Sequence, residues 1–495
     1  MLYYDIIKDH PADKTVFIFK GKTTTYGDFR HQVDTWANFL QAKGVKKGDK
    51  VGLFSKNSPN FVAAYIAIIK AGGVVVPFNF QLIAPEVAYI ASDTDMKIMI
   101  TQKKMDLEPA LAELGFDNKV EQFHFEELWE ETDHEFVQYE MEENENCVII
   151  YTSGTTGRPK GAMLSHRNLI SNSEDFIDVV NVQEDDIAMC VLPMYHCFGW
   201  ICSVSANLLK GTTVVIQETY AFNDAMSLIK RYHVNGFCGV PTMFQLFVKG
   251  AEPEELAQMR YFISGGASLP RILFEGFQRK FGRIVQEGYG LSEATPVCTF
   301  NPASLVKMGS IGLPITHVTV SIQDDDGNEM GVGEVGELCV KGPNVMLGYL
   351  NRPQETAYTL RGGWLHTEDL AYRDEDGYIF IVDRLKDMII SSGENVYPRE
   401  VEEVLMAHPD IVEAAIIGIP DKLRGQAICA YVVPAEGAKL DKRVLRKYLL
   451  ARVAPYKVPK EFILAEQLPR NNTGKILKTV LRERSLNDMV NRHRL

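Results

Sequence analysis

Hydrophobic and polar positions alternate in short blocks through the first three-quarters of the chain. Apolar runs such as KVGLFS (50–55) and VVVPF (74–78) predict buried strands, and residues 61–70 between them have helical spacing. The same rhythm recurs as far as RIVQEG (283–288). Alternation of this kind favours mostly parallel sheets that are covered by helices on both faces.

The pattern changes near residue 310, where apolar runs separated by Gly- and Asp-rich turns predict a small antiparallel, barrel-like region. Strand and helix patterns resume after Asp383, over a length sufficient for a separate domain. We therefore expect an α/β chain of two domains. Residues 1–383 form the large domain with the ATP and acyl sites, and residues 384–495 form a small, mobile α+β domain.

Composition and charge exclude several classes of function. A net charge of −13 over 495 residues argues against a nucleic-acid binder with a basic face. The first residues lack the pattern of a signal peptide, and the most apolar stretch (61–78) is interrupted by Lys70 and two glycines, so no membrane span is expected. Eight scattered cysteines without a CxxC pair predict reduced, mostly buried thiols in a cytoplasmic protein. Peripheral membrane association and a homodimer stay open.

The strongest local motif is YTSGTTGRPKG (151–161), which follows a buried strand and precedes a helix expected near Ser165. Its three glycines allow the backbone to approach an anion, and its amides and hydroxyls can donate hydrogen bonds. The spacing differs from that of a Walker A loop. The motif predicts a phosphate-binding loop, with a flexible surface loop as the alternative. Its ligand residues are Thr152, Ser153, Gly154, Thr155, Thr156, Gly157 and Lys160.

Four further motifs follow in order: EGYGLSE (287–293), GGWLHTEDL (362–370), DRLKDMIISSGENVYPREVE (383–402) and PRNNTGKILK (469–478). Together with the loop they resemble the acyl-adenylate-forming (AMP-binding) superfamily, most of all its fatty acyl-CoA synthetases, over essentially the whole chain. The resemblance implies an ATP-dependent acyl-CoA ligase, an AMP-forming acid–thiol ligase. A carboxylic acid and ATP give acyl-AMP and pyrophosphate, and the acyl group then passes to coenzyme A.

The resemblance implies ATP, Mg²⁺ and coenzyme A as ligands and a medium or long-chain fatty acid as substrate. An aryl acid, including an o-succinylbenzoate-type acid, and the loading of a carrier protein stay open. A non-catalytic binder is disfavoured because Lys475, Glu293 and Asp369 are all present. An amino-acid substrate is disfavoured because no aspartate stands at the acyl side to hold an α-ammonium group.

Roles of single residues also follow from the resemblance. Glu293 and Thr152 would hold Mg²⁺, and Lys475 would stabilise the charge that develops between carboxylate and α-phosphate. Glu293 as a helix cap and Lys475 as a surface lysine of a basic tail are the alternatives. Asp369 and Arg384 would bind the ribose, and Tyr289 would stack on adenine. The remaining nucleotide contacts would be Gly265, Gly266, Ala267, Glu287, Gly288, Gly290 and Ser292.

The second half-reaction and the acyl pocket are assigned in the same way. Lys386 would be the hinge of the mobile domain, while Ser392 and Gly393 would contact coenzyme A. The acyl pocket would comprise Tyr195, His196, Phe198, Gly199 and Thr242. His196 is included among the catalytic residues as a gate beside the acyl phosphate, with a packed histidine as the alternative. The sequence departs from the family pattern where Glu368 replaces a glycine and where Ile390 and Ser392 replace two lysines.

Overall fold

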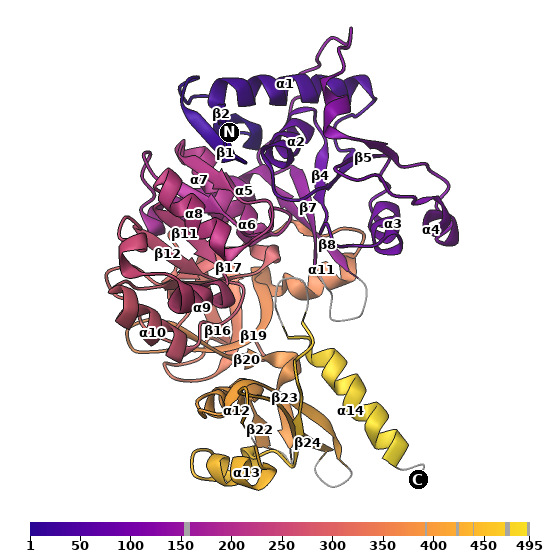
Figure 1. The fold of residues 1–495 in the computed structure, drawn as a ribbon. Helices are drawn as coiled ribbons and strands as arrows, with labels where there is room; N and C mark the ends of the chain where they lie inside the picture. The colour runs from indigo at the N-terminus through magenta and orange to yellow at the C-terminus, as the bar shows by residue number, and fades with distance from the viewer. Residues whose placement is uncertain (153–158, 392–393, 422–424, 439, 471–475, 493–495) are drawn as a thin grey trace. The chain divides into compact units, whose positions relative to one another are not determined.

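The computed structural model describes residues 1–152, 159–391, 394–421, 425–438, 440–470 and 476–492, with side chains as far as residue 487 (Figure 1). The chain divides into two compact units. The first comprises Met1–Val320 and Cys339–His366, and the second comprises Ser321–Leu338 and Thr367–Leu495. The expected boundary between residues 1–383 and a mobile domain of residues 384–495 describes a domain motion, and it stays a prediction.

A seven-stranded sheet of the first unit has buried, parallel strands at its centre. Strand β4 (Val74–Pro77) is buried along its whole length and runs parallel to β3 (Lys50–Phe54) and β7 (Asn146–Thr152). Strands covered on both faces have continuous apolar sequences, as the pattern of this segment predicted. The order is β18–β8–β7–β4–β3–β5–β6, with β5 (Ile98–Thr101), β6 (Glu121–Phe123), β8 (Lys160–Ser165) and β18 (Gly348–Tyr349).

A nine-stranded sheet forms the second layer of the first unit, in the order β15–β14–β13–β12–β11–β9–β10–β1–β2. The six strands from β13 to β1 in this order are parallel to their neighbours. The carboxyl ends of these strands therefore meet at one edge, where α/β sheets bind ligands. The strands are β1 (Thr15–Phe19), β2 (Lys22–Thr25), β9 (Ile187–Cys190), β10 (Thr213–Ile216), β11 (Gly236–Gly239), β12 (Tyr261–Ser264), β13 (Gln286–Gly290), β14 (Val297–Phe300) and β15 (Leu313–Pro314).

Helices cover these sheets and begin at capping residues. The Ser58 side chain accepts a hydrogen bond from the Phe61 amide at the start of α2, and Ser165 caps α5 in the same way. The α-helices are α1 (Tyr26–Ala42), α2 (Pro59–Lys70), α3 (Ala84–Asp93), α4 (Glu108–Glu113), α5 (His166–Val180), α6 (Cys197–Trp200), α7 (Ala206–Lys210), α8 (Phe222–Tyr232), α9 (Pro241–Gly250), α10 (Arg271–Phe281) and α11 (Pro353–Thr359). Shorter helical turns are η1 (Tyr3–Ile7), η2 (Phe125–Trp129), the π-helix η3 (Ile201–Ser205), η4 (Pro253–Leu256), η5 (Ser292–Ala294) and η6 (Arg361–Gly363).

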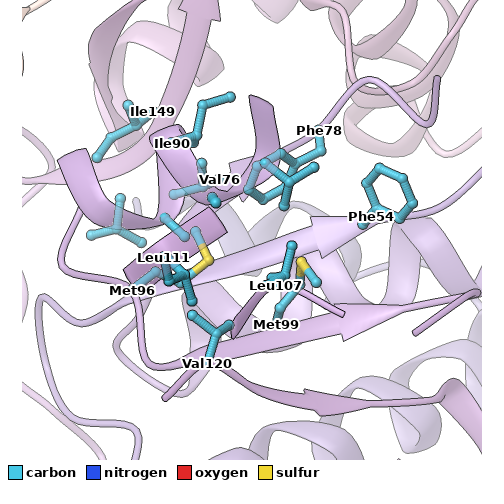
Figure 2. Close-up of a cluster of buried hydrophobic side chains, with 14 residues drawn as sticks. Phe54, Val76, Phe78, Ile90, Met96, Met99, Leu107, Leu111, Val120 and Ile149 are labelled. Atoms are coloured by element: carbon cyan, nitrogen blue, oxygen red, sulfur yellow. The ribbon is translucent and has the colours of Figure 1, made fainter. Parts of the chain in front are cut away.

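One core cluster of the first unit lies between the seven-stranded sheet and helices α3 and α4. Figure 2 shows this cluster, to which Phe54 and Met99 come from strands of the sheet, Leu111 comes from α4, and Phe78 and Met96 come from the adjoining turns. Each of these side chains is almost completely excluded from solvent. Burial on this scale fixes the strands that lead into the phosphate loop.

The second unit is a smaller α+β body with its own core. Helix α12 packs on the long hairpin of β23 and β24, and α13 covers the same cluster of buried aliphatic side chains. In its sheet, of order β22–β21–β24–β23 with β25 paired to β24, the strands are β21 (Ile389–Ser391), β22 (Glu394–Val396), β23 (Ile411–Asp421), β24 (Gly425–Pro434) and β25 (Glu461–Leu464). Its helices are η7 (Leu385–Asp387), α12 (Pro398–Met406), α13 (Lys442–Leu450), η8 (Pro455–Lys457) and the C-terminal α14 (Lys478–Arg492), yellow in Figure 1.

Residues 319–384 form a four-stranded sheet where the antiparallel region was expected. Its order is β16–β17–β19–β20, with β16 (Thr319–Gln323), β17 (Gly336–Lys341), β19 (Leu365–Arg373) and β20 (Ile379–Arg384). Strands β19 and β20 are antiparallel. The predicted α/β fold class, with a smaller C-terminal α+β body, is confirmed. Across the described part of the chain, no helix combines the length and apolar character that a membrane crossing needs.

Candidate active site

The phosphate loop joins two strands of a hairpin. Strand β7 ends at Thr152 and β8 begins at Lys160, and these two residues are register partners. The helix expected near Ser165 begins at His166 with Ser165 as its N-cap, and the segment KGAMLS between the loop and this helix pairs with β7 as a strand that the motif did not indicate. Several predicted site residues lie outside the described residues: Ser153, Gly154, Thr155, Thr156, Gly157, Ser392, Gly393 and Lys475.

Glu293 and Thr152 lie together, as the magnesium assignment requires. The Thr152 hydroxyl donates to the Glu293 carboxylate at 3.4 Å, and the Tyr349 hydroxyl donates to the same oxygen at 2.9 Å. The Glu293 carbonyl also accepts a 2.8 Å hydrogen bond from the Met346 amide, which fixes η5. A carboxylate beside a hydroxyl is a donor set of the kind that Mg²⁺ prefers, so these residues fit that ion.

A segment formed by β18 and α11, residues 348–359, contacts the phosphate loop where the loop leads into β8; we call it the β18–α11 segment. Strand β18 pairs antiparallel with β8, so that Tyr349 lies opposite Ala162. At the start of β8, Lys160 forms an ion pair with Glu355 of α11, and its ammonium lies 5.3 Å from the centre of the Tyr349 ring. The sequence motifs did not indicate Tyr349 or Glu355, because neither belongs to a recognised motif.

The same segment is tied to the helix that precedes β5. Arg352 forms an ion pair with Asp93 of α3 at 3.1 Å, and the Tyr151 hydroxyl donates to Asp93 at 2.6 Å. The Tyr89 hydroxyl donates to the Pro159 carbonyl at 3.3 Å. Both borders of the loop are therefore fixed by side chains that are remote in sequence.

The acyl-side segment, residues 192–200, follows β9 at the carboxyl edge of the nine-stranded sheet. His196 precedes α6, and its Nδ1 accepts a 3.2 Å hydrogen bond from the Phe198 amide. Burial lowers the pKa of His196 to about 4, so the ring is neutral at pH 7 and carries its proton on Nε2. The ring can therefore donate one hydrogen bond from Nε2.

Other predicted acyl-pocket residues differ in placement. Tyr195 and Phe198 are partly buried, whereas Thr242 on α9 is exposed. Gly199 is buried, and a Cβ atom there would lie 2.3 Å from the Pro193 carbonyl oxygen, so close packing of α6 requires glycine at this position. The π-helix η3 continues α6. π-helices are rare in proteins, but those that occur often lie at functional sites. No sequence motif indicated this π-helix.

The glycine turn after β12 faces the acyl-side segment. A Cβ atom added at Gly265 would lie 3.0 Å from the Phe198 ring, and Gly266 has a φ of +76°. Gly266 and Ala267 are exposed. The buried Glu287 carboxylate accepts a 3.1 Å hydrogen bond from the Leu269 amide, so it holds this turn in place.

Strand β13 and η5 carry the other predicted nucleotide residues. Gly288 and Tyr289 are partly buried and Gly290 is exposed at the end of β13. A Cβ atom at Gly290 would lie 1.7 Å from the Pro296 carbonyl oxygen, so only glycine fits there. The Ser292 hydroxyl lies 3.3 Å from the Cys197 thiol, which links η5 to the acyl-side segment.

The second unit brings together the predicted ribose residues. Asp369 of β19 and Arg384 of β20 are register partners, and their side chains form an ion pair at 3.3 Å. Glu368 adopts a left-handed conformation with φ of +58°, a backbone conformation that favours glycine. Its amide donates to the Glu337 carboxylate at 3.1 Å, which stabilises this backbone. Lys386, the predicted hinge, is exposed in η7.

Comparisons with known proteins identify the family. Residues 5–350 match the family model of the AMP-binding enzyme, and residues 400–475 match the model of the AMP-binding enzyme C-terminal domain. The chain belongs to the AMP-binding enzyme family. This AMP-binding enzyme is 37% identical to a feruloyl-CoA synthase of Amycolatopsis sp. over 94% of each chain. It is 33% identical to a long-chain-fatty-acid–CoA ligase of Bacillus subtilis, over 95% of this chain and 92% of the relative.

Solved structures agree with the sequence relatives. The crystal structure of ATP-bound MatB from Rhodopseudomonas palustris matches with a TM-score of 0.92 and 31% identity, over 98% of this chain and 99% of MatB. The expected superfamily is confirmed, and the AMP-binding enzyme is an AMP-forming acid–thiol ligase of the acyl-CoA synthetase type. ATP, Mg²⁺ and coenzyme A are the ligands of this enzyme class.

Proposed function

We propose that this AMP-binding enzyme converts a carboxylic acid with an uncharged, apolar tail to its coenzyme A thioester, with a medium or long-chain fatty acid as the first candidate. The supporting observation is the character of the acyl-side segment. Tyr195 and Phe198 present aromatic surface, Gly265 faces the Phe198 ring, and His196 is neutral at pH 7. Such a surface favours an apolar tail, because burying a second charge there would require a partner.

In the adenylation step, Glu293 and Thr152 would hold Mg²⁺, which neutralises charge on the phosphates of ATP when bound. Lys160 would contact the terminal phosphates, and Lys475 would stabilise the charge that develops at the α-phosphate. The neutral His196 ring would donate from Nε2 to the acyl oxygen. A carboxylic acid is already ionised at pH 7, so no general base is needed.

In the second step, residues 384–495 would rotate as a domain about Lys386 and withdraw Lys475. Ser392 and Gly393 would then contact the pantetheine of coenzyme A, while Asp369 and Arg384 keep the ribose. A cytoplasmic location and the oligomeric state stay predictions.

A second candidate substrate is an aryl acid of the ferulate type. The 37% identity with feruloyl-CoA synthase, over 94% of both chains, supports it. Aromatic side chains on the acyl side would pack equally well on an aryl ring.

The deciding experiment is a panel of acids with ATP, Mg²⁺ and coenzyme A, read by mass spectrometry of the thioesters. The panel contains fatty acids of increasing length, ferulate, benzoate and o-succinylbenzoate. A preference for fatty acids supports the first candidate, and a preference for ferulate supports the second. Loading of a phosphopantetheinyl carrier protein without any coenzyme A ester would refute both.

A further inference from the structure

The ion pair between Lys160 and Glu355 places a carboxylate on the cation of the phosphate loop. The Lys160 side chain is 15% exposed and that of Glu355 is 38% exposed, so the pair lies at the border of the protein interior. Lys160 closes the loop at the start of β8, whereas Glu355 lies in the first turn of α11. The two residues are brought together by the pairing of β18 with β8.

A carboxylate and a phosphate carry the same sign of charge and seek the same donor. An ammonium group has three donors and can contact two anions, but the two anions repel each other, so each one weakens the binding of the other. Glu355 therefore competes with any phosphate that approaches Lys160.

A contact with the Tyr349 ring would keep Lys160 in place when a phosphate replaces Glu355 as the partner of its ammonium group. The Tyr349 ring lies 5.3 Å from the ammonium, and Tyr349 is itself held by its hydrogen bond to Glu293. Such a cation–ring contact is independent of which anion pairs with the lysine. The Glu355 side chain as a whole, by contrast, is more than one-third exposed, although the oxygen that pairs with Lys160 is buried.

We propose that Glu355 is a positioning residue that occupies the Lys160 ammonium before nucleotide binds and competes with the terminal phosphates for it, thereby accelerating the departure of pyrophosphate. This role rests on the proposed function of Lys160 as a phosphate contact. With Glu355 present, the enzyme should bind pyrophosphate more weakly than the same phosphate loop would bind it without that carboxylate.

The test is direct binding of magnesium pyrophosphate to the full chain by isothermal titration calorimetry, which requires no turnover. Glu355→Gln keeps the shape of the side chain and removes its charge. We expect this variant to bind magnesium pyrophosphate about fivefold more tightly than the wild type, since partly exposed ion pairs contribute modest energies. Glu184→Gln is the matched control, because Glu184 is an exposed carboxylate of the same unit that pairs with Lys14. It should change binding less than twofold.

A second pair of variants tests whether Glu355 acts through the lysine. In the Lys160→Met background, Glu355→Gln should change the affinity less than twofold. Equal or weaker binding by Glu355→Gln alone would overturn the proposal, as would a fivefold gain that persists without Lys160. Failure of the wild type to form any thioester would refute the proposed function but would leave this binding comparison intact. Steady-state inhibition by pyrophosphate should show the same ranking in active enzyme.

Discussion

Lys478 is the first residue of α14 and is the partner of a carboxylate in the interior of the second unit. Its ammonium lies 2.8 Å from the Glu402 carboxylate, and the two side chains are only 16% and 14% exposed. Glu402 also accepts a 2.7 Å hydrogen bond from the Ile416 amide of β23. The change Lys478→Met removes the charge, keeps most of the aliphatic stem and leaves Glu402 with a single described donor.

The size of the effect follows from this burial. Removal of one partner of a fully buried ion pair costs about 3–5 kcal/mol, whereas exposed pairs contribute about 1 kcal/mol or less. With this slight residual exposure, we expect Lys478→Met to lower the free energy of unfolding of the second unit by about 2–3 kcal/mol. Lys460→Met is the matched control: its ion pair with Asp421 is of similar length, 2.7 Å, but the lysine is 59% exposed. The control should lose less than about 1 kcal/mol.

The loss should depend on pH. Burial raises the pKa of Glu402 above its ordinary value, the neighbouring Asp383 raises it further, and Lys478 opposes both. Without Lys478 the pKa rises more, so the folded protein takes up a proton at a higher pH than the unfolded chain. Stability is then recovered as the pH falls through the folded-state pKa. The deficit of Lys478→Met should therefore be largest at pH 8 and shrink toward pH 5.

Hydrogen–deuterium exchange of peptides from α12 is the suitable assay, because all four tryptophans lie in the first unit and their fluorescence would report on that unit. Adding Glu402→Gln to Lys478→Met should restore most of the protection at pH 8. A deficit equal to that of Lys460→Met, or one that is independent of pH, would refute the argument that this pair is buried and coupled.

Three further predictions concern the active site. Lys475→Ala should slow carboxylate-dependent pyrophosphate exchange by more than about a hundredfold, which corresponds to about 3 kcal/mol, yet spare thioester formation from supplied acyl-AMP. Equal loss of both steps would contradict the proposed hinge. Gly265→Ala puts a Cβ atom 3.0 Å from the Phe198 ring. We therefore expect kcat/KM to fall about tenfold for bulky acids and little for acetate. An equal fall for all acids would argue against Gly265 and Phe198 as a wall of the acyl pocket. Because the pKa of His196 is about 4, its ionisation should not affect kcat between pH 6 and 8. A fall of kcat toward pH 6 that disappears in His196→Asn would disprove that this ring is neutral.

Much of the fold could be predicted because its cues are local. The apolar run at Val74–Pro77 and the capping serines at positions 58 and 165 mark elements through nearest neighbours in the chain. The segment Lys160–Ser165 shows the limit of such cues. Its burial does not alternate along the strand, and its glycine and short length hide a strand that forms by pairing with β7.

The candidate site was predictable only where a motif contains the residue. Thr152 and Glu293 belong to motifs, and the structure brings them together. Tyr349 and Glu355 do not, and an isolated tyrosine or glutamate in a polar segment gives no sign of its partner. Their contacts depend on the pairing of β18 with β8, which is set by tertiary structure.

The contacts of the β18–α11 segment also constrain the order in which the protein is made. Arg352 and its partner Asp93 are separated by 259 residues, and the first unit is completed only by residues that follow position 338. A nascent chain that has exposed the entire phosphate loop on the ribosome therefore has Tyr89 and Asp93 but still lacks Tyr349, Arg352 and Glu355. Long-range closure of this kind slows folding. The phosphate-loop part of the nucleotide site should therefore acquire its full set of contacts late in synthesis, when roughly the first 360 residues have left the ribosome exit tunnel.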